Sequence, residues 1–328
     1  MHAWRVVIFL SLLAAAIAQE QQVHLDEEHG KRYNVTLNFD DIPTNSSGIG
    51  FDPWKQSKPL HYNDLFFQSF TVVNVAKARD SLPHPIDLLC ASSAPNALFS
   101  SRKAGYPWPR FSFHDLSGHP TKPQDANITF NMRSVTLSPT GNVSAGDDRV
   151  LVGLRISLLK LPSDGSGSSL QDATSAQADF PGLVRGSPSI PQGAHVSQLL
   201  VAFGPGPHQS VKLDYERFAR VIPGFGQGVD VLEVVADLYR WDEAKQSYRI
   251  DGDWQVCLDD IEIEVVQPKK KEEEDESMLE SMQGQETRLF LAVAEDGRLI
   301  DDKERGEKLW REIEQDGSAL VYETVDIE

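Results

Sequence analysis

Alternating hydrophobic and polar positions recur along residues 34–266, with the period of two that is typical of half-buried β-strands. Two further runs, Val150–Leu161 and Leu199–Phe203, are hydrophobic at almost every position, which indicates strands covered on both faces. The four valines of Val229–Trp241 favour a strand there over a helix. The alternating segments are Val35–Phe39, Ile128–Met132, Val211–Tyr215 and Ile261–Val265.

Two local signals interrupt this pattern. The hydrophobic phase of the strand that begins near Ile128 slips by one residue at Ser134, which indicates a β-bulge. Asp251-Gly252 stands between two strand-like runs, and Asp-Gly is a preferred two-residue hairpin turn because both positions need positive φ. We therefore expect a bulge in the first segment and a tight hairpin at the second.

Many short strands predict an all-β fold, a jelly-roll-like antiparallel β-sandwich over residues 33–266. Within it, residues 162–197 are rich in Ser, Gly, Ala, Asp and Pro, which favours a flexible, low-complexity loop insertion. Residues 267–328 carry 9 basic and 19 acidic side chains, so they hold −10 of the formal net charge of −18. Such a segment buries little hydrophobic surface, and we expect a largely disordered acidic C-terminal tail that is at most partly helical.

The N-terminus has the layout of a secretory signal peptide. A basic residue precedes the mostly hydrophobic run Val6–Ala16, which is too short to anchor a membrane protein, and small residues follow up to Ala18. We predict cleavage after Ala18. The dibasic pair Lys31-Arg32 is a candidate site for a kexin-type processing protease, with two solvated charges as the alternative. The predicted segments are 1–18, the signal peptide, and 19–32, a pro-segment.

Two further features agree with export from the cell. The two cysteines of the chain, Cys90 and Cys257, predict a disulfide, because free thiols are disfavoured in an oxidising compartment. Four Asn-x-Ser/Thr sequons predict N-glycosylation of surface loops. The candidate acceptors are Asn34, Asn45, Asn127 and Asn142.

Charge and motifs exclude more functions than they indicate. A net charge of −18 repels nucleic acid, and no second hydrophobic stretch predicts a membrane span. The chain has no nucleophile elbow, Walker loop, His-Glu-x-x-His motif or zinc-spaced ligand set, so the sequence identifies no catalytic residue. A glycosidase built on two carboxylates stays open, because 49 acidic residues offer many pairs.

Two pairs of aspartates form a candidate calcium site. Asp40-Asp41 follows the first predicted strand, and Asp259-Asp260 lies within the last one. The terminal strands of a jelly roll often run side by side, which would bring these carboxylates together. Carboxylates are the ligands that Ca²⁺ prefers, whereas unpaired carboxylates repel one another. The alternative is that each pair only solvates a strand end.

Aromatic residues in polar surroundings suggest a sugar-binding platform. Tyr106 and Trp108 lie in a proline-rich aromatic loop, and Trp54 and Trp241 have polar neighbours. Flat aromatic rings stack against the C–H faces of sugars, so these side chains are candidates for glycan stacking. The alternative is that they cover the ends of the core.

The segments that open and close the predicted domain are Leu37–Pro43, Tyr62–Asn74, Cys90–Leu98 and Asp253–Glu262. Together they resemble a group of secreted fungal proteins of unassigned function, which open with Phe-Asp-Asp and close with a Trp-x-x-Cys-x-Asp-Asp strand. More loosely, they look like galactose-binding-like and concanavalin-like jelly rolls, many of which are carbohydrate-binding modules. The resemblance covers about residues 34–266. It implies a sandwich fold and a Cys90–Cys257 disulfide, and it transfers no catalytic residue.

These observations predict a secreted, non-enzymatic glycan-binding or cell-wall-associated glycoprotein. Its expected partner is a cell-wall polysaccharide, and Ca²⁺ is the one cofactor that the sequence suggests. A sandwich-fold polysaccharide hydrolase or lyase is the alternative. A further alternative is a secreted effector or adhesive protein whose acidic tail binds a basic protein partner.

Overall fold

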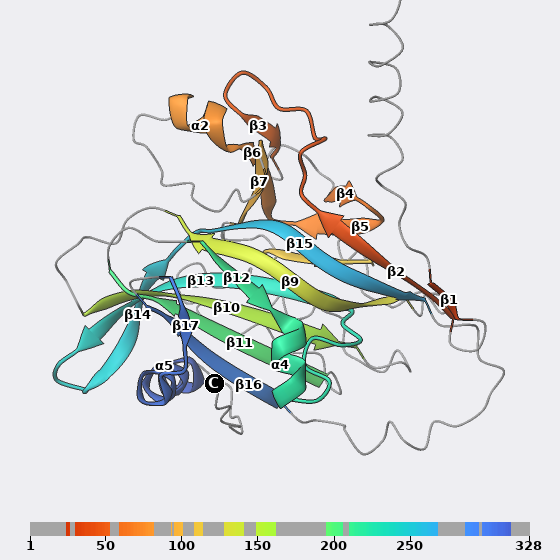
Figure 1. Ribbon diagram of the computed structural model, residues 1–328. Helices are drawn as coiled ribbons and strands as arrows, with labels where there is room; N and C mark the ends of the chain where they lie inside the picture. The colour runs from red at the N-terminus through yellow and green to blue at the C-terminus, as the bar shows by residue number, and fades with distance from the viewer. Residues whose placement is uncertain are drawn as a thin grey trace, which may run out of the picture.

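The protein is a β-sandwich in which two sheets stack face to face (Figure 1). This finding confirms the predicted all-β sandwich class. In the described part of the chain, no helix has the length and hydrophobicity needed to cross a membrane. The computed structural model describes residues 24–26, 30–52, 59–81, 93, 95–100, 108–113, 128–140, 149–161, 195–205, 210–267, 286–294 and 297–315.

Eight strands form the first sheet, here called sheet A, and nine form the second, sheet B. Sheet A contains β1 (His24–Asp26), β2 (Gly30–Leu37), β3 (Ile49–Phe51), β6 (Phe70–Asn74), β7 (Asn96–Ser100), β9 (Thr129–Pro139), β12 (Val211–Asp214) and β15 (Val256–Gln267). Sheet B contains β4 (Leu60–Tyr62), β5 (Leu65–Gln68), β8 (Arg110–Ser112), β10 (Val150–Lys160), β11 (His195–Phe203), β13 (Val231–Asp242), β14 (Ser247–Asp253), β16 (Glu286–Val293) and β17 (Leu299–Ile300). The helices are α2 (Val75–Ser81), α4 (Tyr215–Val221) and α5 (Lys303–Gln315).

Strand β15 is the centre of sheet A. It pairs with β9 along one side, and on the other side it pairs with β7 through residues 256–258 and with β2 through residues 261–267. The partner changes at Asp259-Asp260, where Asp260 has a φ of 45° and the register with β9 shifts. A second shift lies opposite Ser134, which confirms the predicted bulge. On this side of β15, sheet A therefore divides at Asp259-Asp260 into one part that contains β7 and another that contains β2.

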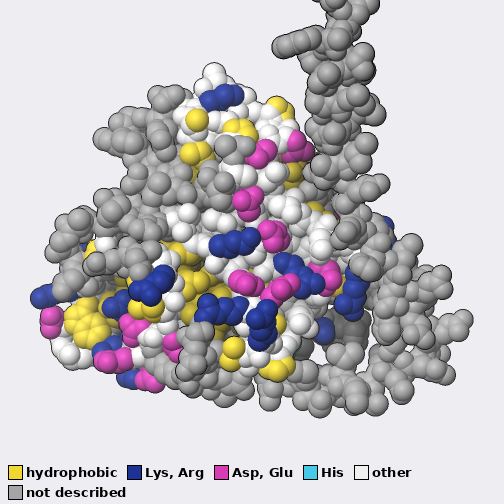
Figure 2. Space-filling model, viewed as in Figure 1, with side chains coloured by type: hydrophobic (Ala, Val, Ile, Leu, Met, Phe, Trp, Pro, Cys, Tyr) yellow, Lys and Arg dark blue, Asp and Glu magenta, His cyan; other side chains and the backbone are white. Residues whose placement is uncertain are grey.

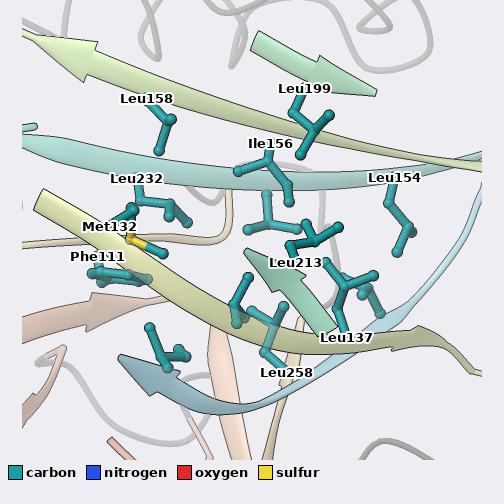
Figure 3. Packing of buried hydrophobic residues seen from close by; sticks show 14 of the residues in the cluster. Phe111, Met132, Leu137, Leu154, Ile156, Leu158, Leu199, Leu213, Leu232 and Leu258 are labelled. Atoms are coloured by element: carbon teal, nitrogen blue, oxygen red, sulfur yellow. The ribbon is translucent and has the colours of Figure 1, made fainter. Parts of the chain in front are cut away.

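The main core lies between the two sheets. Leu154, Ile156 and Leu158 of β10 point towards side chains of sheet A (Figure 3). The other face of β10 is also buried, as its hydrophobic run predicts. Further side chains in this layer are Phe111, Met132, Leu137, Leu199, Leu213, Leu232 and Leu258 (Figure 3).

The C-terminal segment corrects the prediction of a largely disordered tail for residues 286–315. Strand β16 pairs in parallel with β11 at the edge of sheet B, and Leu289 and Leu291 enter the inter-sheet core. The run from Thr287 to Val293 is hydrophobic enough to form a buried strand, although its acidic surroundings dominate the average composition. The tail prediction failed because it used the composition of the whole segment.

Helix α5 covers part of the outer face of sheet B. Leu309 is fully buried in a second cluster with Phe290 of β16 and Tyr239 of β13. Gly306 allows this close approach, because a Cβ atom there would lie 2.6 Å from the Phe290 ring. The helix therefore belongs to the folded domain.

The predicted hairpin at Asp251-Gly252 is wrong. Both residues lie inside β14, and the turn that precedes this strand is formed by residues 243–246, with Gln246 at a φ of 51°. Asp251 is an extra residue in the ladder between β13 and β14, so the Asp-Gly pair forms a bulge. Both features favour the same residue types, which is why sequence alone did not separate them.

The predicted segment boundaries shift at two places. Lys31 and Arg32 lie within β2, where they pair with β1 on one side and with β15 on the other. A protease that needs an extended chain would first have to open this ladder. The predicted insertion of residues 162–197 ends earlier, because β11 begins at His195. Residues 162–194 and the signal peptide lie outside the described residues.

Candidate functional site

The structure places both aspartate pairs at the junction where sheet A divides. Leu37 at the end of β2 lies opposite Ile261 of β15, so the chain that follows β2 passes close to Asp259-Asp260. Asp40 accepts a hydrogen bond from the backbone N–H of Asn96, at 2.9 Å. Asp259 accepts one from the backbone N–H of Ser93, also at 2.9 Å. Both pairs therefore lie near the place where β2, β7 and β15 meet, and the predicted cluster of four carboxylates stays a prediction.

These carboxylates bind protein donors. Asp41 accepts a hydrogen bond from the Tyr62 hydroxyl at 2.8 Å; burial, and secondly this contact, raise the pKa of Tyr62. Among the described residues, no group of three or more His, Cys, Asp or Glu side chains could hold a metal ion. The calcium site therefore stays a prediction, to which the structure adds no ligand set.

The carboxyl group of Asp259, at this junction, has a raised pKa. Its side chain is completely buried, and burial raises the pKa of Asp259 to about 6 although the backbone N–H groups of Ser93 and Asp260 oppose the shift. The carboxyl group is therefore easier to protonate in the folded protein than in the unfolded chain. The ionised Asp259 carboxylate lowers the free energy of unfolding above pH 6. This destabilisation disappears as the pH falls towards about 4, the pKa of an aspartate in the unfolded chain.

We expect Asp259→Asn to remove this pH dependence. Wild-type stability relative to the variant should increase between pH 7.5 and pH 4.5, by on the order of 2 kcal/mol after solvent screening. Urea unfolding at several pH values measures the difference. Asp64→Asn makes the same chemical change in an exposed turn and serves as the control. A constant difference between wild type and Asp259→Asn at all pH values would contradict the assignment.

The structure describes half of the predicted covalent sites. Asn34 and Asn45 are exposed, and Asn45 uses its Oδ1 to accept hydrogen bonds from Ser47, so its Nδ2 remains available for a glycan. Cys257 is buried on β15, and the described residues contain no free cysteine. Residues that lie outside the described part of the chain are Cys90, Asn127 and Asn142.

Trp108, one of the predicted stacking residues, is not part of an exposed platform. The ring of Trp108 is buried, and the guanidinium carbon of Arg155 lies 5.3 Å from its centroid. This geometry favours packing, the alternative interpretation of Trp108. Tyr106 and Trp54 lie outside the described residues.

The outer face of sheet B carries a row of polar side chains that crosses six strands. Each member lies opposite the next in the strand register, and all six are buried. We call this set the polar row. Its members, from β16 to β5, are Arg288, Gln198, Ser157, Glu233, Arg110 and Gln68.

Hydrogen bonds and charge pairs hold the polar row together. Arg110 donates from Nε to Oε1 of Gln68 at 2.6 Å, and Glu233 lies opposite Arg110 in the register. Burial lowers the pKa of Arg110, whereas the charge of Glu233 opposes this effect. Gln198 donates to the Ser157 hydroxyl at 3.2 Å. These contacts lie in a low-dielectric layer, where each one is stronger than in water.

An aromatic pair lies at the far end of the same face. Trp241 of β13 is opposite Tyr248 of β14, and their ring centroids are 5.1 Å apart in a T-shaped arrangement. Both side chains are partly exposed, and Figure 2 shows hydrophobic side chains at the surface in the region of β14 and α5, with charged groups around them. Lys308 of α5 places its ammonium nitrogen 5.1 Å from the Trp241 ring.

Charged groups also lie on the hairpin that carries this aromatic pair. Arg240 donates to Asp251 at 3.0 Å, and Arg249 lies 3.6 Å from the same carboxylate. Arg240 and Arg249 alternate with Trp241 and Tyr248 along β13 and β14, so these two arginines point to the opposite face of the hairpin. The sequence places Trp241 among polar neighbours but gives no reason to pair it with Tyr248. The pairing depends on the turn between β13 and β14, which the predicted Asp-Gly hairpin misplaced by several residues.

The fold and this face define the class of the protein, a two-sheet β-sandwich with a partly exposed aromatic pair on one sheet. No protein-family model matches the chain, and no curated protein matches it either. A crystal structure of a DUF4465 family protein from Bacteroides caccae is 8% identical and has a TM-score of 0.37. The alignment covers 72% of this chain and 99% of that protein.

Proposed function

We propose that this protein is a secreted, non-enzymatic glycan-binding protein and that sugar stacks on Trp241 and Tyr248. The observation that carries the proposal is the partly exposed aromatic pair at the end of sheet B. Aromatic rings that have an apolar face and a solvent-exposed edge can bind a ligand that presents both C–H groups and hydroxyl groups. The predicted signal peptide and sequons support an extracellular role.

Charged neighbours supply the polar half of such a site. Arg149 lies opposite Trp241, whose backbone N–H donates to its carbonyl, and Arg149 pairs with Glu243 of the turn between β13 and β14. This pair is substantially exposed, so it contributes little to stability and can exchange partners with sugar hydroxyls. A stacking surface beside adaptable donors and acceptors is typical of glycan recognition.

The outer face of sheet B does not favour the hydrolase alternative. Its two buried carboxylates, Glu233 and Asp237, are four residues apart on one strand. Four residues of a strand span roughly 13 Å, whereas the two carboxyls of glycosidases are about 5–10 Å apart. This pair therefore gives no support to hydrolysis.

We expect the full chain to be retained on at least one insoluble polysaccharide among chitin, β-glucan, cellulose and mannan. Trp241→Ala and Tyr248→Ala should each weaken retention by about tenfold or more, because each removes one stacking ring. Lys308→Ala should not weaken it, since the substitution uncovers Trp241. Phe66→Ala removes a partly exposed aromatic ring elsewhere on sheet B and is the matched control.

Two outcomes would end the proposal. Wild-type protein that passes through every polysaccharide column binds no glycan of this panel by any site. Equal retention of wild type, Trp241→Ala and Tyr248→Ala would place the binding elsewhere. Release of reducing ends or unsaturated sugars during the assay would instead favour the hydrolase or lyase alternative. Parallel assays with Ca²⁺ and with EDTA test the predicted calcium site.

A further inference from the structure

The ring of Trp241 already binds a cation of the protein itself. Lys308 of α5 places its ammonium nitrogen 5.1 Å from the centroid of this ring. A cation within about 6 Å of an aromatic centroid is attracted by the negative face of the ring. The Lys308 side chain is 31% exposed, so this contact lies at the surface of the protein. The Trp241 ring therefore serves as a surface on which an ammonium group can bind.

A carboxylate binds the same ammonium group. Glu304 lies one helical turn before Lys308 and accepts a hydrogen bond from its Nζ at 2.7 Å. This hydrogen bond lowers the pKa of Glu304, so the carboxylate is ionised in mildly acidic solution. The Glu304 side chain is 82% exposed and open to a ligand. Trp241 and Glu304 thus supply an aromatic ring and an anion to one cation, and we call these two side chains the ammonium site.

Lys308 is a replaceable occupant of the ammonium site. Cation–π contacts and ion pairs are both weak at exposed positions, because water solvates the separated groups well. Lysine has a flexible stem, so its side chain can turn into solvent while the fully buried Leu309 holds α5 on the sheet. A ligand with its own ammonium group restores both contacts after it displaces Lys308, whereas a neutral ligand restores neither.

We propose that the ammonium site binds the protonated amino groups of a glucosamine-containing glycan. This inference rests on the proposed function and names the ligand class of the same aromatic pair. The ammonium group of the sugar takes the place of the Lys308 ammonium, and the sugar ring contacts Tyr248, whose ring centroid is 5.1 Å from that of Trp241. The net charge of −18 also attracts cationic ligands to the protein.

The surroundings of the site favour an amino sugar over a lysine-rich peptide. A lysine of a partner offers the same ammonium and methylene groups as Lys308, which is tethered beside the ring at a high effective concentration. Such a peptide makes no contact at this site that the protein does not already make. An amino sugar adds hydroxyl groups, which the exposed ion pair between Arg149 and Glu243 beside Trp241 can bind.

The test compares two oligosaccharides that differ only in the acetylation of their nitrogen atoms. Full-length protein is titrated by calorimetry with a glucosamine oligomer and with the N-acetylglucosamine oligomer of the same length. At pH 5.5 the free amino groups are protonated, whereas the acetylated ones are neutral. An ionic strength near 0.15 M screens charges that lie more than about 8 Å from the ligand. We expect the glucosamine oligomer to bind about tenfold more tightly.

Substitutions locate this preference at the ammonium site. Trp241→Ala should abolish it, and Lys308→Ala should strengthen the binding of both oligomers about threefold, because the internal occupant is lost. In the Lys308→Ala background, Glu304→Gln should reduce the preference about threefold, because the ligand loses its anionic partner. The matched controls are Lys212→Ala and Glu262→Gln, which break a similar exposed ion pair on sheet A and should change neither affinity.

The outcomes separate this inference from the proposed function. Equal affinity of wild type for the two oligomers overturns the amino-sugar site and leaves glycan binding intact. Failure of both oligomers to bind also overturns this inference, and it overturns the proposed function only if every polysaccharide column fails as well. A preference that survives Trp241→Ala would come from the net charge of the chain and would overturn the site.

Two further results would contradict the proposal. Weaker binding of both oligomers by Lys308→Ala would show that Lys308 supports the site and does not occupy it. A lysine oligomer that binds as tightly as a glucosamine oligomer of equal charge would identify a basic peptide as the occupant. Glu304→Gln changes an exposed side chain, so its effect on binding can be measured without loss of the fold.

Discussion

A chain that ends at Gln267 is expected to lose cooperative folding. This truncation removes β16 and α5 and with them four large buried side chains, Leu289, Phe290, Leu291 and Leu309. At about 2 kcal/mol for each side chain, the lost burial amounts to about 8 kcal/mol, which is comparable to the whole stability of a typical domain. The truncation also exposes the edge of β11, a hydrophobic strand that can then pair with other chains.

Size-exclusion chromatography and urea unfolding measure this effect. A chain that ends at Gln315 keeps β16 and α5 and is the matched control, since it also loses acidic residues from the C-terminus. We expect this control to unfold cooperatively as a single species and the shorter chain to aggregate or to show no cooperative transition. A monomeric, cooperatively folded chain that ends at Gln267 would contradict this prediction, because it would show that the C-terminal segment contributes little to the stability of the sandwich.

This segment shows where sequence reasoning fails. The hydrophobic run from Thr287 to Val293 has the length of a strand, but its acidic surroundings dominate any average over the last 62 residues. Its partner, β11, lies some 90 residues earlier, and the pairing is parallel in an otherwise antiparallel sheet. Neither distant pairing nor strand direction follows from local periodicity. The sandwich class itself was predictable because alternation recurs in many strands.

The candidate sites depend on register even more strongly. The glutamine, serine, glutamate and arginine side chains of the polar row occupy single positions in strands that otherwise look hydrophobic, such as Val150–Lys160. Only the alignment of six strands brings these positions together. By contrast, the sequence could place the aspartate pairs near one another, because Asp40-Asp41 follows β2 and Asp259-Asp260 lies on β15, the strand that pairs with β2.

The second large effect is expected from the predicted disulfide. Cys90→Ser and Cys257→Ser should each lower stability by about 5 kcal/mol at most, since the bond would close a loop of 168 residues in the unfolded chain. The structure supports the pairing from the side of Cys257. Ser93, three residues after Cys90, donates from its backbone N–H to Asp259, two residues after Cys257. The segment that carries Cys90 therefore reaches β15 close to Cys257.

Urea unfolding of wild type, both single variants and the double variant tests this pairing. If the two cysteines are bonded to each other, all three variants should lose nearly the same stability, because one bond can be lost only once. A reducing agent should lower the free energy of unfolding of wild type to that of the variants and should leave the stability of the variants unchanged. Additive losses in the double variant would contradict pairing. Burial is the main cause of the raised pKa of Asp259, so if loss of the predicted disulfide exposes this carboxylate, the cysteine variants should also show a weaker dependence of stability on pH between 7.5 and 4.5.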